Sequence, residues 1–351
     1  MIYIRAAKPV EMSVRRFPAE WEPQSMVQFT FPHADSDWAD MLEEVTPCFV
    51  ACVEAVARFQ KVLVVAEDRE RVESLLEHVP QDQITVVACP SNDTWARDHG
   101  GITILEGGKP LLLDFMFNGW GLKFPANKDN LITRTLHLWG FFGEVKIERA
   151  HMVLEGGALE TDGQGTLLST TECLMSPNRN PHLSFAETEA TLQQYLGVDR
   201  FLWLDNGHLV GDDTDSHIDT LARFIDPSTI AYVQCTDETD EHYAELKLME
   251  QELQSFRTRE GEPYQLVPLP WPSACFAEDG HRLPATYANF LIINGAVLVP
   301  TYNVPEDGAA LTILAKCFPK REIIAINCRS LIEQHGSLHC ISMQYPNLLG
   351  I

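Results

Sequence analysis

Basic residues are scarce in this chain of 351 residues, because 26 Lys and Arg stand against 50 Asp and Glu and leave a formal net charge of −24. Such a charge repels nucleic acids and anionic membrane surfaces, so we expect neither as a partner. A small cationic substrate would be attracted instead. Acidity also keeps a protein in solution, and this general effect explains part of the excess.

Long apolar runs are missing as well. None approaches the ~20 residues of a membrane-spanning helix, and the longest candidate, 290–299, is interrupted by Asn294-Gly295. The first five residues, Met-Ile-Tyr-Ile-Arg, lack the apolar segment of a secretion signal. We therefore expect a cytoplasmic protein.

The nine cysteines are odd in number and include no Cys-x-x-Cys pair. Most lie in apolar runs such as Val87-Ala88-Cys89. This pattern is typical of reduced thiols, and it argues against a disulfide framework or a zinc site.

Predicted strands and helices alternate along the whole chain. Apolar spacing predicts a helix over 38–59, a continuous apolar run predicts a strand over 61–66, and Asn294-Gly295 predicts a hairpin. About five such units follow one another without a low-complexity linker, which favours a propeller-like α/β fold. A doubly wound open sheet is the alternative.

The segment 92–100, Asn-Asp-Thr-Trp-Ala-Arg-Asp-His-Gly, follows a predicted strand. Its residues are common turn formers, so a structural role is one interpretation. The face of Trp95 can also stack on a flat cation, and Asp98 can accept paired hydrogen bonds from a guanidinium. Arg97 can instead neutralise a neighbouring acid.

A second turn places Glu155 before two glycines, which let a ligand approach the backbone closely. A plain turn with a solvated carboxylate fits the residues equally well. Glu106-Gly107-Gly108 has the same composition, but Lys109-Pro110 follows it and indicates an exposed hairpin.

The third turn, 207–219, holds two His and four Asp. His217 and Asp219 flank Ile218, so on a strand both would point to one face. A histidine with a carboxylate beside it can transfer protons. The same residues can bind a metal ion, although the segment has neither an HExxH helix nor the order of a calcium loop.

The fourth segment, 336–342, reads Gly-Ser-Leu-His-Cys-Ile-Ser. Most lone cysteines are inert core residues, but the preceding turn can present Cys340 at the end of a strand. His339 would point to the opposite face of that strand. We therefore expect His217, although distant in sequence, to be the acid/base partner of Cys340.

Together these turns resemble the agmatine deiminase and bacterial (Porphyromonas-type) peptidyl-arginine deiminase family of guanidino-group-modifying enzymes. The matching segments span about residues 17–345. They are Pro18-Ala19-Glu20-Trp21-Glu22-Pro23, 92–98, 115–121, Leu154-Glu155-Gly156-Gly157, Asn178-Arg179-Asn180-Pro181-His182, 211–214, 217–219 and 338–341.

This resemblance implies the pentein fold, an α/β-propeller of five ββαβ-type modules around a pseudo-fivefold axis, as one domain over residues 1–351. It also implies roles for individual residues. Cys340 would be the nucleophile and His217 the general acid/base, with Glu155 orienting His217. Asp98 and Asp219 would grip the guanidinium. Assembly into a homo-oligomer is compatible with the sequence.

The implied reaction needs neither metal nor cofactor. The thiolate of Cys340 attacks the planar guanidinium carbon, His217 protonates the departing ammonia, and water then hydrolyses the thiouronium intermediate to a ureido product. We expect agmatine to yield N-carbamoylputrescine, a step of putrescine biosynthesis. The alternatives are deimination of peptidyl arginine and, in another class, a metal-dependent hydrolase built on His217 and Asp219.

The substrate tail is less well defined by the sequence. Its expected walls are Trp95, Asn118 and Trp120, and acids that could close the pocket around a free amine are Asp212, Asp213 and Asp215. Family members often carry Gly-Gly-Gly before the cysteine motif, whereas this chain has Gln334-His335-Gly336. His99-Gly100-Gly101 likewise replaces Thr-Gly-Pro.

Overall fold

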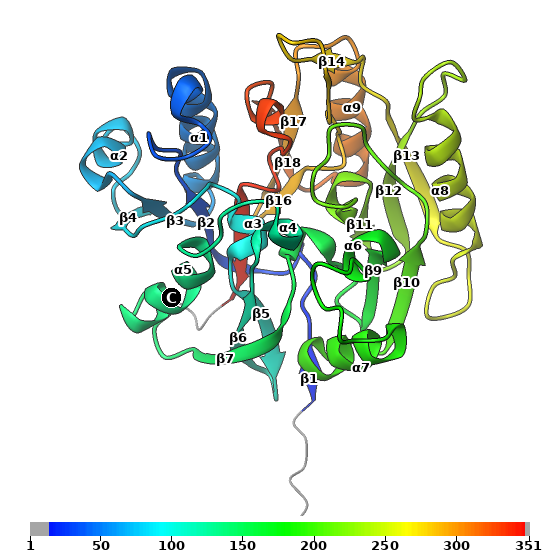
Figure 1. The fold of residues 1–351 in the computed structure, drawn as a ribbon, viewed down its shortest axis with the longest axis horizontal. Coiled ribbons are helices and arrows are strands. Elements are labelled where there is room, and N and C mark those ends of the chain that lie inside the picture. The colour runs from blue at the N-terminus through cyan, green and yellow to red at the C-terminus, as the bar shows by residue number, and fades with distance from the viewer. Residues whose placement is uncertain (1–13, 348–351) are drawn as a thin grey trace, which may run out of the picture.

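The computed structural model describes residues 14–347 and has a mixed α/β fold (Figure 1). The described strands form five sheets of three or four strands and one two-stranded pair. In sheet order they are β19 (Ser342–Pro346), β2 (Gln24–Thr30), β3 (Lys61–Ala66), β4 (Ile84–Ala88); β1 (Arg15–Arg16), β5 (Ile102–Glu106), β6 (Lys109–Met116), β7 (Lys146–Val153); β10 (Arg200–Leu204), β9 (Thr166–Thr170), β8 (Glu160–Thr161); β11 (Ala222–Asp226), β12 (Thr229–Gln234), β13 (Gln265–Pro270); β16 (Leu291–Ile293), β17 (Ala296–Thr301), β18 (Glu322–Asn327); and the pair β14 (Cys275–Phe276), β15 (Arg282–Leu283).

One pairing pattern recurs in the five larger sheets. A central strand pairs antiparallel with one neighbour and parallel with the other, and a helix connects the two parallel strands. These helices are α1 (Leu42–Ala57), α5 (Asp129–Leu138), α7 (Phe185–Leu196), α8 (Tyr243–Ser255) and α9 (Asp307–Cys317). The predicted repeating unit is therefore present. The alternative of one doubly wound sheet is wrong, because the described strands divide into separate sheets.

Short helices occupy several of the connections. They are α2 (Arg69–Leu75), α3 (Ala96–His99), α4 (Gly119–Leu122), α6 (Thr171–Leu174) and the 3₁₀ turns η1 (Ala39–Met41), η2 (Gly156–Ala158), η3 (Ile218–Thr220) and η4 (Leu331–Gln334). A strand that already includes Ile218 is not observed. The chain forms η3 there, and the strand begins only at Ala222.

Local sequence signals account for the regular elements. The apolar run 61–66 forms β3 as predicted and is buried after its first residue. Helix α7 begins with a capping box between Ser184 and Glu187, which satisfies backbone groups that the helix start leaves free. It ends at Gly197, whose φ of 72° lies in the left-handed region that glycine adopts without steric cost.

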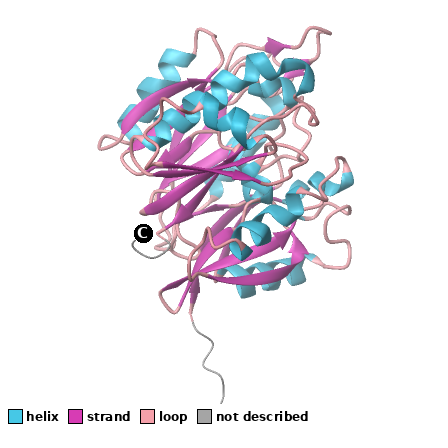
Figure 2. Cartoon of the chain, turned by 90° about the vertical axis from the view of Figure 1, so that its left-hand side faces the viewer, coloured by secondary structure: helices cyan, strands magenta, loops and turns pink. Residues whose placement is uncertain are grey.

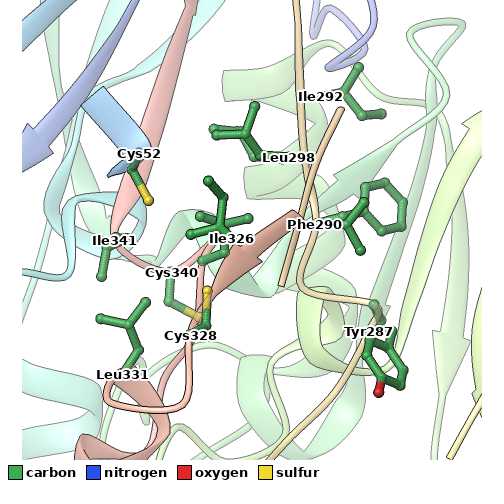
Figure 3. Close-up of a cluster of buried hydrophobic side chains, with 14 of the residues drawn as sticks. Cys52, Tyr287, Phe290, Ile292, Leu298, Ile326, Cys328, Leu331, Cys340 and Ile341 are labelled. Atoms are coloured by element: carbon green, nitrogen blue, oxygen red, sulfur yellow. The ribbon is translucent and has the colours of Figure 1, made fainter. Parts of the chain in front are cut away.

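The strands cross the middle of the molecule and most helices lie toward its periphery (Figure 2). Figure 3 shows part of the largest buried cluster, to which Leu331, Cys340 and Ile341 belong. The turn that carries Cys340 is thus anchored in the core. Within residues 14–347, no helix combines the length and apolarity that crossing a membrane requires.

Pairing between the ends of the described chain places this turn. Strand β19, which follows Cys340, pairs antiparallel with β2 near the N-terminus. The sequence had indicated that Cys340 lies at the end of a strand. It lies instead in the turn before β19. The Glu106-Gly107-Gly108 turn joins β5 to β6 as the predicted hairpin.

Candidate active site

Asp98 lies in α3, in the turn after β4, and is 4% exposed. The indole N–H of Trp120 donates to its Oδ2 at 2.9 Å, and the backbone N–H of Gly157 donates to its Oδ1 at 3.0 Å. Burial raises the pKa of Asp98 to about 6. A carboxylate that is buried with few donors favours the arrival of a cation.

Glu155 precedes η2 and is fully buried. The guanidinium Nε of Arg179 lies 2.8 Å from its Oε2, and the Nε2 of His217 lies 3.8 Å from the same oxygen. Burial alone would raise the pKa of Glu155, but His217 and Arg179 outweigh it and hold the pKa below its usual value. Glu155 is therefore an ionised carboxylate that faces Nε2 of His217.

His217 lies between two carboxylates. Its Nδ1 is 3.6 Å from Oδ1 of Asp98, while Glu155 faces Nε2, and neither ring nitrogen has a hydrogen-bond partner. Burial would lower the pKa of His217, but Asp98, Cys173 and Glu155 raise it well above its usual value. The imidazole is therefore held in its proton-donating form. Gly157 is required beside it, because a Cβ there would lie 2.5 Å from Nδ1.

Asp219 lies in η3, two residues after His217. Its Oδ2 is 2.7 Å from Nδ1 of His339, whereas its Oδ1 is buried without a hydrogen-bond partner. Burial would raise the pKa of Asp219, but His339 and His217 lower it below the usual value. One oxygen of an ionised carboxylate thus remains available.

Cys340 faces Asp219 across 3.8 Å, and its Sγ is 3.4 Å from Oδ1 of Asn289. That amide oxygen also accepts from the backbone N–H groups of His339 and Cys340, at 2.8 and 3.3 Å. Burial raises the pKa of the Cys340 thiol well above its usual value, and Asp219 and Asp98 raise it further. A bound cation would offset both carboxylates and favour the thiolate.

The pocket in front of Cys340 has about 390 Å³ of space between its atoms, part of which is open solvent. Its lining includes Trp95, Asp98, Trp120, Asp213, His335 and Cys340. Aromatic walls with carboxylates and a thiol suit a flat cation. The indole of Trp95 packs over Gly336, where any Cβ would overlap the ring. The one glycine retained before Cys340 is therefore the one that Trp95 requires.

The other residues expected around the substrate tail differ in their surroundings. Asp213 lines the pocket, and burial raises its pKa to about 6. Asp212 instead accepts hydrogen bonds within its own loop, and Asp215 pairs with Lys123 and Arg179, each at 2.6 Å. Asn118 caps α4 through Gly121 and does not line this pocket.

The two residues that replace the expected glycines shape one rim of the pocket. His335 adopts a left-handed φ of 68°, and its Nδ1 lies 2.7 Å from the backbone oxygen of Gly211. The side-chain amide of Gln334 donates to the backbone oxygen of Asp37 at 2.9 Å. Both side chains connect this segment to neighbouring loops.

A metal centre on His217 and Asp219 is not supported. Among residues 14–347, the group of side chains that could share an ion is Glu155, Cys173 and His217, which leaves Asp219 out. Arg179 also lies on Glu155, and its charge would oppose a cation. The structure therefore gives no support to the metal-dependent alternative.

Three residues of this site were given no role by the sequence analysis. Cys173 packs against His217 and Glu155, Arg179 pairs with Glu155, and Asn289 holds the turn at Cys340. Arg179 stands in a segment that resembled the family, which was an available signal. Cys173 and Asn289 lie in ordinary apolar or turn sequence, so only the fold identifies them.

Comparisons with known proteins agree on one family. Residues 16–346 match the model of the Porphyromonas-type peptidyl-arginine deiminases. The agmatine deiminase of Pseudomonas aeruginosa is 32% identical over 360 residues, covering 94% of this chain and 95% of that protein. A Porphyromonas gingivalis structure named as a candidate arginine deiminase has a TM-score of 0.90 at 55% identity, covering 95% of this chain and 98% of that one. The C. jejuni agmatine deiminase with substrate bound has a TM-score of 0.90 at 37% identity, with 97% and 98% covered.

A family match over nearly the whole described chain, together with curated relatives above 30% identity, settles the assignment. The chain belongs to the Porphyromonas-type peptidyl-arginine deiminase family.

Proposed function

We propose that this protein hydrolytically deiminates a small guanidino compound, agmatine first, to N-carbamoylputrescine and ammonia. One observation carries the proposal most directly. Cys340 and Asp98 line the same pocket, and the second carboxylate, Asp219, lies 3.8 Å from the sulfur with one oxygen free. A protonated, planar guanidinium matches two carboxylates arranged around a thiol.

In the proposed mechanism Asp98 and Asp219 bind the guanidinium N–H groups and place its carbon before Cys340. The thiol of Cys340 gives up its proton to solvent as the cation binds, and the thiolate attacks that carbon. The C–N bond to one amino group then breaks as His217 supplies the proton that turns it into ammonia. His217 then takes a proton from water, which attacks the S-alkylthiouronium carbon and releases the thiolate. Glu155 stabilises the charge of His217 throughout.

Agmatine is preferred because curated relatives covering the chain are named as agmatine deiminases. The carboxylate of Asp213 at the pocket is a fitting partner for a terminal ammonium. Peptidyl arginine is the second candidate, supported by the family match and by a 44% identical structure named for that activity. Trp95 and Trp120 are proposed as walls for either tail, and Asn118 as a support of the loop that carries Trp120.

The wider assignments belong to the same proposal. The repeated pairing in five sheets supports a propeller of five modules around a pseudo-fivefold axis, as one domain over residues 1–351. Nine free thiols support a reducing, cytoplasmic location. The reaction would serve putrescine biosynthesis.

A substrate panel tests the proposal. Purified protein is given agmatine, free arginine or an arginine-containing peptide, and ammonia and ureido product are both measured, with and without a chelator. We expect the highest kcat/KM with agmatine and no effect of the chelator. Ureido formation from the peptide alone would transfer the assignment to the second candidate. Absence of ureido product from all three would refute deimination.

A further inference from the structure

A line of buried side chains with alternating charge leads from the nucleophile into the interior. In order they are Asp219, His339, Glu20 and Arg223. Nδ1 of His339 lies 2.7 Å from Oδ2 of Asp219, its Nε2 lies 2.7 Å from Oε2 of Glu20, and Nη2 of Arg223 lies 2.9 Å from the same Glu20 oxygen. None is more than 7% exposed.

His339 lies between two carboxylates. Both of its ring nitrogens face carboxylate oxygens, which only accept hydrogen bonds when ionised. Burial would raise the pKa of Glu20, but Arg223 and His339 outweigh it and lower the pKa well below its usual value. The pKa of Asp219 is lowered as well. The ring therefore joins two ionised carboxylates, one beside the nucleophile and one in the interior.

This contact selects which oxygen of Asp219 remains free. Oδ2 is occupied by Nδ1 of His339, while Oδ1 has no hydrogen-bond partner. The backbone oxygen of Asp219 accepts from the side-chain amide of Asn289 at 3.2 Å, so the residue is held at both ends. Without His339 the carboxylate could rotate, and it would lose the charge that keeps it ionised.

We propose that His339 is a positioning residue for deimination, holding Asp219 ionised with one oxygen free for the guanidinium, and that Glu20 holds His339 in turn. This inference rests on the proposed function, because it assigns Asp219 to the substrate cation. It gives a role to Glu20, which lies in the conspicuous Pro-bounded segment near the N-terminus but far from the pocket in sequence.

The imidazole can be removed without freeing the turn that carries the nucleophile. The backbone N–H of His339 donates to Asn289 at 2.8 Å, and Nε of Arg97 donates to its backbone oxygen at 3.4 Å. The backbone N–H of Arg97 also donates to the oxygen of Cys340 at 3.1 Å. These contacts involve no ring atom, so side-chain variants test the proposed role.

Two electrophiles separate positioning from a structural role. 2-Chloroacetamidine carries a planar amidinium cation, and iodoacetamide is its neutral counterpart. With either reagent the sulfur of Cys340 forms a bond to the methylene carbon, halide leaves, and the thiol proton goes to solvent. Labelling rates come from intact mass, and peptide mapping assigns the label to Cys340. The ratio of the two rates measures recognition of the cation.

The variants differ in how many contacts of the His339 ring they remove. His339→Asn keeps an N–H near the position of Nδ1 but loses the contact with Glu20, and His339→Leu loses both. Glu20→Gln keeps a hydrogen-bonding partner for the ring but removes the carboxylate charge beside it. We expect the amidinium-to-amide ratio to fall about tenfold in His339→Leu, as for loss of a hydrogen bond between charged groups. His339→Asn and Glu20→Gln should give smaller losses, and KM for agmatine should rise more than kcat falls.

The outcomes are distinguishable. Both labelling rates falling together in a folded His339→Leu, judged by circular dichroism and thermal melting, would show a purely structural residue and overturn the inference. An unchanged ratio in all three variants would overturn it too. Should His339→Leu not fold, the ratios of His339→Asn and Glu20→Gln decide. No labelling of Cys340 in the unmodified protein would refute the proposed nucleophile, and the inference with it.

Discussion

The two sides of His217 each carry a thiol beside a carboxylate, yet they differ in access and in charge. On the pocket side, Cys340 lies near Asp98 and Asp219 and lines an opening to solvent. On the other side, Cys173 lies near Glu155 and does not line that pocket. The pocket therefore leads to the sulfur of Cys340 and does not include that of Cys173.

Charge compensation separates the two sides more sharply. Arg179 already neutralises Glu155 through a buried ion pair at 2.8 Å. On the pocket side Asp98 instead accepts hydrogen bonds from the neutral Trp120 and Gly157, and Nδ1 of His217 lies farther away, at 3.6 Å. Asp219 has His339 on one oxygen and no hydrogen-bond partner on the other. The pocket side is therefore less fully compensated, which supports the proposal that it binds the cation and carries the nucleophile.

Replacement of each sulfur by oxygen, in separate Cys340→Ser and Cys173→Ser variants, is the strongest test of this comparison. Cys340→Ser should lower kcat by about 10⁴-fold or more, as for loss of a catalytic nucleophile, because a hydroxyl of similar size is far less ionised. Cys173→Ser should stay active to within about tenfold, since it removes only a neighbour of His217. Ammonia release measures both. The reverse ranking would move the nucleophile to Cys173.

Removal of a carboxylate charge beside Cys340 should give the next largest effect. Asp219→Asn keeps the shape but removes the charge, and kcat/KM should fall by about 10²–10³-fold, as for a lost stabilising contact to a developing charge. Glu106→Gln is the control, because Glu106 lies in the exposed β5–β6 hairpin. A similar loss in both variants would point to general electrostatics and not to the pocket.

On the compensated side, the main cost should be to stability. Arg179→Met leaves Glu155 buried without its ion pair, and we expect the free energy of unfolding to fall by about 3–5 kcal/mol. Arg69→Met breaks an exposed pair with Glu73, for which the expected loss is about 0.5 kcal/mol or less. Urea denaturation measures both. Equal losses would show that Arg179 is not required to neutralise Glu155.

The smallest effect concerns pH. Asp98 has a pKa of about 6 and binds a cation only when ionised, so kcat/KM should fall as the pH drops below that value. The hydrogen bond from Trp120 lowers this pKa, so Trp120→Phe should move the acid limb to higher pH. Trp139→Phe, at an exposed position, serves as the control. If the acid limb of kcat/KM does not move in Trp120→Phe, Asp98 is not the group whose ionisation controls it.

Much of the fold followed from local signals in the sequence. The apolar run of β3 and the capping box of α7 define those elements without help from distant contacts. The start of η3 and the turn at Cys340 were assigned to strands incorrectly, because their conformation depends on contacts made far along the chain. One of these is the bond that Asn289 accepts from the backbone of His339.

The site was predictable where chemistry is visible in residue type. Glu106 and Glu155 precede identical glycine pairs, and only the Lys-Pro that follows Glu106 distinguishes the hairpin from the buried turn. The roles of Asp215 and Asp213 could not be distinguished, because Arg179 and Lys123 pair with the carboxylate of Asp215 and not with that of Asp213. Cys173 gave no signal, since a buried cysteine in an apolar segment is ordinary.

The raised pKa of Cys340 bears on the resistance of this thiol to oxidation. Peroxides and other oxidants react with thiolates far faster than with thiols. Two carboxylates and burial keep this sulfur protonated until a cation enters. In the proposed mechanism the substrate cation therefore promotes the thiolate as it binds, and the protein without substrate presents little thiolate to oxidative damage.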